Sequence, residues 1–157
     1  MALLSGPPVH FSGNLPVSLL EVPLSIGAAI ASVLRQYATF SGRARRSEYW
    51  WYSLAYAIVS GALTGVATGL GSGSTGYSLV MGLSGLVSLA LLLPTLAVFV
   101  RRMHDTNRSG FWFFLGFVPL VGGIILLVWT ILPGTVGPNR FGEDPKAVAT
   151  SPAPATV

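Results

Sequence analysis

The chain has 157 residues, of which 52% are hydrophobic and only 9% are charged. Soluble domains carry roughly 25% charged residues, so this composition excludes an ordinary water-facing surface. The absence of cysteine excludes disulfides and thiolate metal sites, and the net charge of +4 does not form a basic tract of the kind that binds nucleic acid. Residues 49–100 contain no Asp, Glu, Lys or Arg, as expected of segments that lie in hydrocarbon.

The first part of the chain predicts a short helix after an irregular segment. Residues 1–23 contain four prolines, and we predict a flexible N-terminal segment. Residues 25–38 then place apolar side chains at helical spacing behind Ser25, a candidate N-cap. This pattern is typical of an amphipathic helix in the membrane interface. A span over residues 15–34 is an alternative that Glu21 and two prolines disfavour.

Three apolar segments follow, and they predict an all-α membrane protein with three transmembrane helices at about 49–70, 77–100 and 111–132. The second contains Pro94, where we expect a kink. Glycines and Pro119 interrupt the third, so a re-entrant segment is an alternative, although it would require burial within protein. We assign residues 24–146 to one membrane domain and residues 147–157 to a disordered tail.

The placement of arginine predicts the orientation. Basic residues precede the first span and follow the second, whereas the Gly/Ser turn at 71–76 between them is uncharged. By the positive-inside rule, both basic segments are cytoplasmic. Three full spans would place the C-terminal tail outside, and a re-entrant third segment would return it to the cytoplasm.

Three polar motifs flank the apolar segments. They are Ser-Gly-Arg-Ala-Arg-Arg-Ser-Glu-Tyr-Trp-Trp at 41–51, Arg-Arg-Met-His-Asp-Thr-Asn-Arg-Ser-Gly at 101–110 and Gly-Pro-Asn-Arg-Phe-Gly-Glu-Asp-Pro at 137–145. In order and spacing they resemble the DUF805 family of small bacterial inner-membrane proteins, the group that includes YhaH-like proteins. The resemblance covers roughly residues 30–146, with Met103 where Leu is usual. It implies a bacterial plasma-membrane location and leaves the activity open.

The charged residues of the first two motifs have two interpretations. They are membrane anchors that neutralise one another in local pairs (Arg101–Asp105, Asp105–Arg108, Arg45–Glu48), or they form a composite pocket for a phosphate-bearing headgroup. The candidate headgroup-binding residues are Arg43, Arg45, Arg46, Glu48, Arg101, Arg102, His104, Asp105 and Arg108. The C-terminal motif adds Asn139, Arg140, Phe141 and Gly142. We expect this face to bind anionic lipid or a partner protein.

We expect no catalytic residues, no metal and no cofactor. His104 and Asp105 are adjacent, so on a helix their side chains point about 100° apart and cannot form a relay. Glu48 could orient His104 across the two loops, but no nucleophile is indicated beyond ordinary serines.

The first span carries two further patterns. Gly61, Gly65 and Gly69 predict a helix-packing face, either against the second span at Gly82, Gly85 and Ser88 or against another copy of the chain. Ser60, Thr64 and Thr68 form a hydroxyl stripe that would suit an alternative function, a subunit of an oligomeric small transporter or channel.

Overall fold

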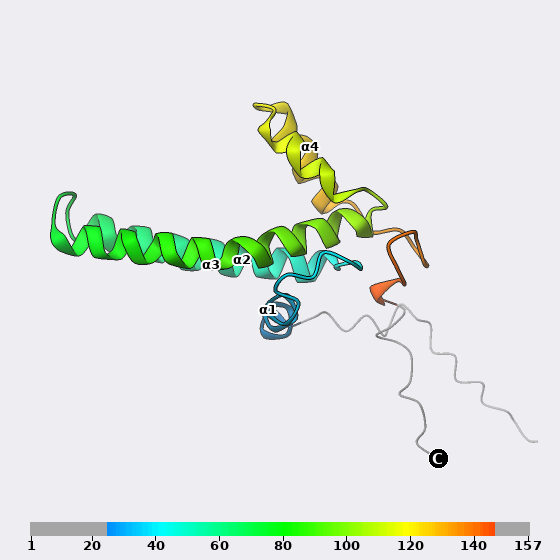
Figure 1. The fold of residues 1–157 in the computed structure, drawn as a ribbon, viewed down its shortest axis with the longest axis horizontal. Helices are drawn as coiled ribbons and strands as arrows, with labels where there is room; N and C mark the ends of the chain where they lie inside the picture. Colours follow the sequence, from blue (N-terminus) through cyan, green and yellow to red (C-terminus); the bar gives the residue numbers. More distant parts are fainter. Residues whose placement is uncertain (1–24, 147–157) are drawn as a thin grey trace, which may run out of the picture.

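A computed structural model describes residues 25–146, and these residues form helices and turns with one isolated bridge between Asn139 and Gly142. The predicted all-helical class is confirmed for this part of the chain. The predictions for residues 1–23 and 147–157 lie outside it. The elements, in chain order, are α1 (Ile26–Arg35), α2 (Arg46–Gly69), α3 (Thr75–Asp105), the 3₁₀ helix η2 (Gly110–Phe117) and α4 (Val121–Ile131) (Figure 1).

Helices α2 and α3 form a long antiparallel pair (Figure 1). Each extends beyond its predicted span at the charged end, because α2 begins at Arg46 and α3 continues to Asp105. At 1.5 Å per residue α3 is about 46 Å long. Among the described helices, only α3 is both long and apolar enough to cross a membrane by length and composition. Three transmembrane helices are therefore not confirmed.

Helix α3 ends in a defined cap that aims the chain toward η2. Asn107 adopts a left-handed conformation, with φ of 57°. Its N–H donates to the carbonyl of His104, and the N–H of Arg108 donates to the carbonyl of Met103, each at 2.9 Å. This pairing is a Schellman motif with Asn in the position where Gly is commonest.

Pro94 lies inside α3 and links it to the segment after α1. Proline has no N–H, so the carbonyl of Ala90, four residues earlier, loses its helical donor. The hydroxyl of Tyr37 donates to this carbonyl instead. Next to it, the hydroxyls of Tyr52 and Thr95 are 3.0 Å apart. The carbonyl that Pro94 leaves without a helical donor therefore becomes a polar contact for the segment that follows α1.

Helix α1 begins as the sequence predicts but ends earlier. The Ser25 hydroxyl accepts the N–H of Ala28 at 3.3 Å, which confirms the N-cap, and the helix stops at Arg35 rather than continuing to residue 38. Ala29 and Val33 are fully buried on its inner face. Figure 1 views α1 nearly along its axis while α2 and α3 lie across the page, so α1 crosses the pair at a steep angle.

The third span, predicted at about 111–132 with interruptions at its glycines and Pro119, does not form a single helix. The chain runs along η2, turns at residues 118–120 and returns along α4, which has only 11 residues. The rings of Trp112 and Trp129 meet edge to face across the two arms, with their centroids 5.3 Å apart. Pro119 removes a helical donor, and Leu120 turns the chain with φ of 61°.

The two arms of this hairpin meet at Gly122. A Cβ at this position would lie 1.7 Å from the carbonyl oxygen of Leu115, so only glycine permits the approach. The chain therefore reverses direction between η2 and α4, as the re-entrant alternative requires.

The predicted packing of the α2 glycine ridge against α3 is also wrong. Added Cβ atoms at Gly61, Gly65 and Gly69 would meet nothing within 4 Å, and the same is true at Gly82 and Gly85. Of the predicted face on α3, Ser88 does contact α2, but its partner is Tyr56 rather than the glycine ridge, with the two hydroxyls 3.5 Å apart. Packing of the ridge against another copy stays a prediction.

Candidate functional site

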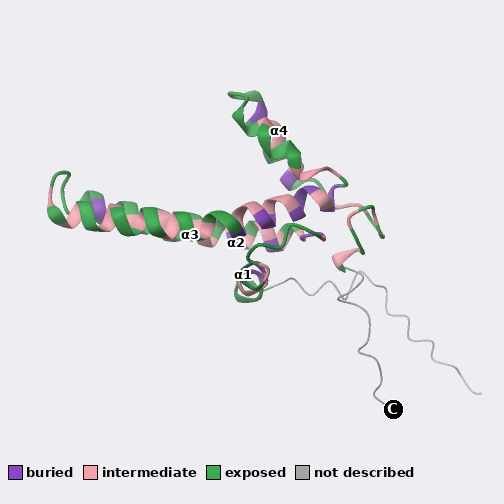
Figure 2. Cartoon of the chain, viewed as in Figure 1, coloured by how far each residue is buried: buried purple, intermediate pink, exposed green. Residues whose placement is uncertain are grey.

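Buried residues gather at one end of the molecule, where α1, the start of α2 and the end of α3 meet (Figure 2). The largest fully buried side chains there include Arg101 and Arg102, beside Met103 and Val98. Arginine is almost never fully buried unless it is paired. The partners of these guanidinium groups therefore define the site.

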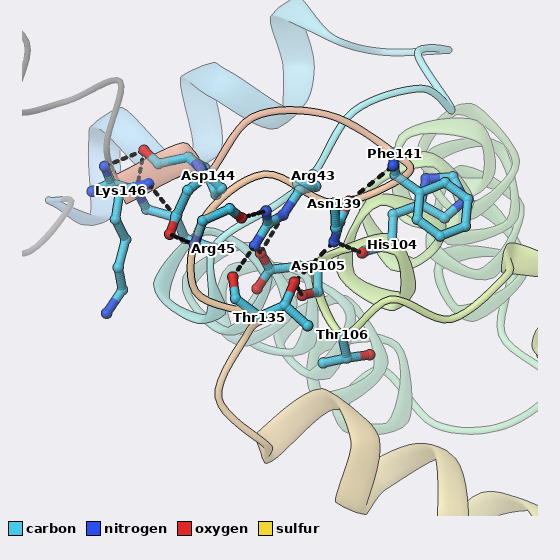
Figure 3. Close-up of polar contacts among 12 residues, drawn as sticks. Arg43, Arg45, His104, Asp105, Thr106, Thr135, Asn139, Phe141, Asp144 and Lys146 are labelled. Carbon is cyan, nitrogen blue, oxygen red and sulfur yellow. Dashed lines mark hydrogen bonds and ion pairs between the residues drawn. The ribbon is translucent and has the colours of Figure 1, made fainter.

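Asp105 is the centre of the first cluster (Figure 3). Its Oδ1 accepts from Nε of Arg43 at 3.0 Å and lies 3.0 Å from Nη2 of the same residue, while its Oδ2 pairs with Arg102. All three side chains are buried. Because two guanidinium groups share one carboxylate, removing that carboxylate would leave two uncompensated charges inside the protein.

The segment after α4 packs onto this cluster (Figure 3). Arg43 donates to the carbonyl of Gly137 at 2.6 Å and to that of Thr135, and the N–H of Thr135 donates to the carbonyl of Asp105 at 2.8 Å. Gly134 passes so close that a Cβ there would lie 2.1 Å from Oδ2 of Asp105. The chain therefore returns to the same end as the first two motifs.

The returning end of the hairpin is capped by side chains from α2 and α3. The last carbonyls of a helix have no partner within the helix, and cations near them are favourable. The donors are Arg102 (to Thr130 at 3.1 Å and to Leu132), Arg46 (to Ile131 at 3.2 Å) and Trp50 (to Thr130 at 3.3 Å). The first two motifs thus hold the broken third segment in place.

A second buried pair joins α1, α2 and α3. Nη1 of Arg101 lies 3.2 Å from Oε1 of Glu48 and donates to Oε1 of Gln36 at 2.8 Å. The same Glu48 oxygen accepts the hydroxyl of Ser32 at 2.9 Å. Nε and Nη2 of Arg101 have no hydrogen-bond partner among the described residues. This pair is therefore less completely satisfied than the one at Asp105.

His104 lies beyond the apolar part of α3 and contacts the C-terminal motif. Its Nδ1 is 3.1 Å from the carbonyl of Gly42, so this nitrogen carries the proton, and its ring stacks on Phe141 at 3.9 Å. Asn139 donates to the His104 carbonyl at 2.9 Å. Burial lowers the pKa of His104 below its usual 6.5, the Gly42 hydrogen bond opposes this effect, and the positive charge of Arg140 adds to it.

The outer part of the C-terminal motif contacts the start of α2. Nε of Arg45 donates to the carbonyl of Pro145 at 3.0 Å. Asp144 accepts the N–H groups of Gly137 and Lys146 at 3.0 and 2.9 Å. Burial raises the pKa of Asp144, but these two donors and the nearby positive charges outweigh burial, so the net shift is downward. Figure 3 shows this chain of contacts running from Lys146 to His104.

Three ion pairs predicted from local spacing are wrong: Arg101–Asp105, Asp105–Arg108 and Arg45–Glu48. Packing brings Glu48 of α2 to Arg101 and brings Arg43 to Asp105, whereas the second partner of Asp105, Arg102, lies three residues before it on α3. Arg108 lies past the end of the helix, with its guanidinium 4.5 Å from the ring centroid of Trp129. Glu48 does not orient His104, whose ring contacts Gly42 instead.

Several residues of the site were not predicted from the sequence: Ser32, Gln36, Thr130, Gly134 and Thr135. Ser32 and Gln36 are four residues apart on a mostly apolar helix, and this polar pair on one face is a signal that could have found them. No local pattern marks Gly134, because its role depends on the approach of Asp105.

The buried charged side chains of this site are paired with one another rather than exposed. Both buried carboxylates pair with guanidinium groups, and the His104 ring meets a backbone carbonyl. Within residues 25–146, no group of three or more His, Asp or Glu side chains could hold a metal ion.

Residues 37–143 match the family DUF805, which is described as a protein of unknown function. The chain belongs to the DUF805 family. It is 48% identical to inner membrane protein YhaI of Escherichia coli K12 over 120 residues. The aligned residues cover 73% of this chain and 92% of the relative. It is 40% identical over 117 residues to inner membrane protein YhaH of the same strain, covering 73% and 93%.

A third relative, uncharacterized protein YiiR of Escherichia coli K12, is 36% identical over 99 residues, which cover 61% of this chain and 60% of the relative. No solved structure matches the chain. The family match includes the segment from Tyr37 through the Asn139–Gly142 motif, so it contains most of the buried network.

Proposed function

We propose that this DUF805 protein resides in the bacterial inner membrane and binds anionic phospholipid headgroups at its charged end. The observation that carries the proposal is a division among the arginines. Arg43, Arg101 and Arg102 are buried within the network, whereas Arg35, Arg46 and Arg140 remain exposed around it. Exposed guanidinium groups at one end of an apolar molecule suit a surface of lipid phosphates.

The inner-membrane location is supported by the names of YhaI and YhaH and by the surface of the chain. Large apolar side chains are exposed along the helices, including Leu79, Leu86 and Leu89 of α3, each 68–69% exposed. In water, exposed apolar surface of this extent would favour association, whereas in a bilayer it faces lipid. We place α2 and α3 across the membrane and α1 in the interface.

We place the hairpin of η2 and α4 in a single leaflet. Its arms have 8 and 11 residues, and each is therefore about 16 Å long, half of a ~30 Å hydrocarbon core. Most of the backbone at its tip is paired internally, with N–H groups of Val118, Val121 and Gly122 bonded to carbonyls of the same hairpin. This pairing supports insertion, because unpaired backbone groups are costly in lipid.

In this topology all three polar motifs lie on the cytoplasmic side. The positive-inside rule favours that side for the arginines, and the uncharged Gly/Ser turn lies at the opposite end of the pair. Each basic side chain near an anionic leaflet contributes about 1 kcal/mol of attraction. We also propose a binding role rather than a catalytic one, since each buried carboxylate already has a guanidinium partner.

The topology is tested by cysteine labelling in whole cells, since the chain has no native cysteine. Single cysteines at the exposed positions Ser41, Ser72 and Val136 are treated with a membrane-impermeant thiol reagent. We expect Ser72→Cys to label from outside and the other two to label only after permeabilisation. Labelling of Val136→Cys in intact cells would show that the third segment crosses the membrane.

Headgroup binding is tested by native mass spectrometry of the full chain released from bilayers that contain phosphatidylglycerol and phosphatidylethanolamine with the same acyl chains. We expect preferential retention of phosphatidylglycerol, reduced in Arg35→Gln/Arg140→Gln by up to about fivefold per removed charge. Glu143→Gln, which removes an exposed acid, is the matched control and should leave the preference intact or raise it. Equal retention of both lipids by the unsubstituted protein would refute the proposal. We expect neither lipid to be hydrolysed or transferred in the presence of the protein, and hydrolysis or transfer of either lipid would refute the non-catalytic role.

A further inference from the structure

An apolar cavity lies between the hairpin and the long helix pair. Its volume is about 290 Å³, near the lower end of the roughly 300–1,000 Å³ typical of ligand pockets. It is partly open to the outside, and its walls come from α2, α3, η2 and α4. The principal lining residues are Tyr49, Leu96, Phe99, Phe113, Phe117 and Leu126.

The chemistry of the cavity wall suits a hydrocarbon chain. Apart from Tyr49, its one polar side chain is Thr95, whose hydroxyl already donates to the carbonyl of Leu91 at 2.6 Å. Aromatic contacts hold the walls apart, with the ring of Phe99 5.8 Å from that of Phe113 and 6.4 Å from that of Tyr49. Empty apolar space forfeits dispersion contacts, so a flexible apolar ligand would stabilise it.

The exposed basic residue that follows from the position of Tyr49 in the cavity wall is Arg46. It lies one helical turn before Tyr49 on α2, so the two side chains share a face of the helix. The Arg46 guanidinium also reaches across to the carbonyl of Ile131 at the end of α4. It therefore joins α2 and α4, two of the four elements that border the cavity, at their charged end, and remains exposed there.

We infer that the cavity between the hairpin and α3 holds one acyl chain of an anionic glycerophospholipid, whose phosphate is bound by Arg46. A phosphodiester accepts two guanidinium hydrogen bonds, which matches the chemistry of this side chain. This inference rests on the proposed headgroup binding and adds a specific binding site for one lipid. The cavity takes part of a single chain, and the remaining chain lies against the outer surface of the hairpin.

The test is photocrosslinking of the full chain in vesicles of phosphatidylethanolamine and phosphatidylglycerol. A trace of either lipid carries a diazirine within one acyl chain, and labelled positions are mapped by mass spectrometry. We expect labelling at residues 95–99 and 113–126 to exceed labelling at the exposed residues 83–89 of α3. With the phosphatidylglycerol probe, the excess should be about fivefold greater than with the phosphatidylethanolamine probe, the effect of one basic side chain at an anionic surface.

Two cavity-filling variants, Leu96→Trp and Leu126→Phe, should lower cavity labelling to the level of residues 83–89. Leu86→Trp, on the exposed face of the same helix, is the matched control and should not. Arg46→Gln should remove the preference between the two probes. Even labelling of the whole apolar surface, full labelling of both filled variants, or equal labelling by both probes would each overturn the inference.

The outcomes also separate this inference from the broader proposal. Preferential retention of phosphatidylglycerol without cavity labelling would leave headgroup binding by the exposed arginines intact and refute only the acyl-chain site. If the unsubstituted protein shows no preferential retention of phosphatidylglycerol, the proposed function itself is refuted, whatever the cavity binds.

Discussion

The two ends of the α2–α3 pair are held by different forces. At the uncharged end, leucine side chains of α3 face outward, and the hydroxyls of Thr64 and Thr68 bond to carbonyls of their own helix. At the charged end, Arg101, Arg102 and Asp105 are buried and bonded to other elements. Contacts specific to this fold are therefore concentrated in one region.

The difference has a physical cause. Lipid chains are as apolar as leucine, so burial of apolar side chains against one another gains little inside a bilayer. Buried charges, in contrast, are stable only with their own partners. In this protein the polar network therefore specifies how α1, the helix pair and the hairpin fit together, while the apolar end requires only helix-forming residues.

Asp105→Ala should have the largest effect on the stability of the charged end, because it leaves Arg43 and Arg102 without their shared carboxylate. We expect the free energy of unfolding to fall by about 3–5 kcal/mol. Unfolding in detergent micelles titrated with dodecyl sulfate, followed by circular dichroism, measures it. Glu143→Ala removes an exposed acid and should change stability little; similar losses in both variants would contradict a specific role for the network.

Gly122→Ala should disrupt the hairpin while its neighbour tolerates the same change. The new methyl group would collide with the Leu115 carbonyl, whereas a Cβ at Gly123 would meet nothing within 4 Å. We expect Gly122→Ala to lower the free energy of unfolding by about 1–3 kcal/mol through overpacking. Gly123→Ala should leave it unchanged or raise it slightly. The same titration measures both, and equal behaviour would rule out the close approach of η2 and α4.

Tyr37→Phe should remove the donor to the Ala90 carbonyl that Pro94 leaves without its helical partner. The expected loss is about 1–3 kcal/mol, the effect of an unsatisfied polar group. Tyr77→Phe, near the start of α3 at the uncharged end, is the control. An unchanged stability in Tyr37→Phe would show that this contact does not anchor the segment after α1.

A smaller effect is expected from pH. The pKa of His104 is lowered in the folded protein, chiefly by burial, so the unfolded chain takes up the proton first as pH falls. Stability should therefore be full above the usual pKa of 6.5 and should decline below it, as pH falls toward the lowered pKa of the folded state. His104→Gln should flatten this dependence between neutral and mildly acid pH in the unfolding titration, and an unaltered dependence would assign it to another group.

Several features were predictable because their signals are local. The charge-free stretch from 49 to 100 follows from the penalty for charge in hydrocarbon, and Ser25 is an N-cap because its hydroxyl accepts an N–H three residues away. The Gly and Pro residues of 116–123 indicated a broken third segment, although they did not decide between a kinked span and a reversal. The convergence of the three motifs depended on that decision.

The sequence by itself determined the helical class, the apolar segments, the clustering of charge at their ends and the family to which the motifs belong. Only the tertiary structure decided which charges pair and where the chain returns. Arg101 had acceptors at local spacing and at a distance, and local pairs of this kind differ by only a few tenths of a kcal/mol. Burial makes the choice decisive, since a charge removed from water must meet whichever partner the packed chain brings to it, here Glu48 for Arg101 and Arg43 for Asp105, whose other partner, Arg102, lies at local spacing on the same helix.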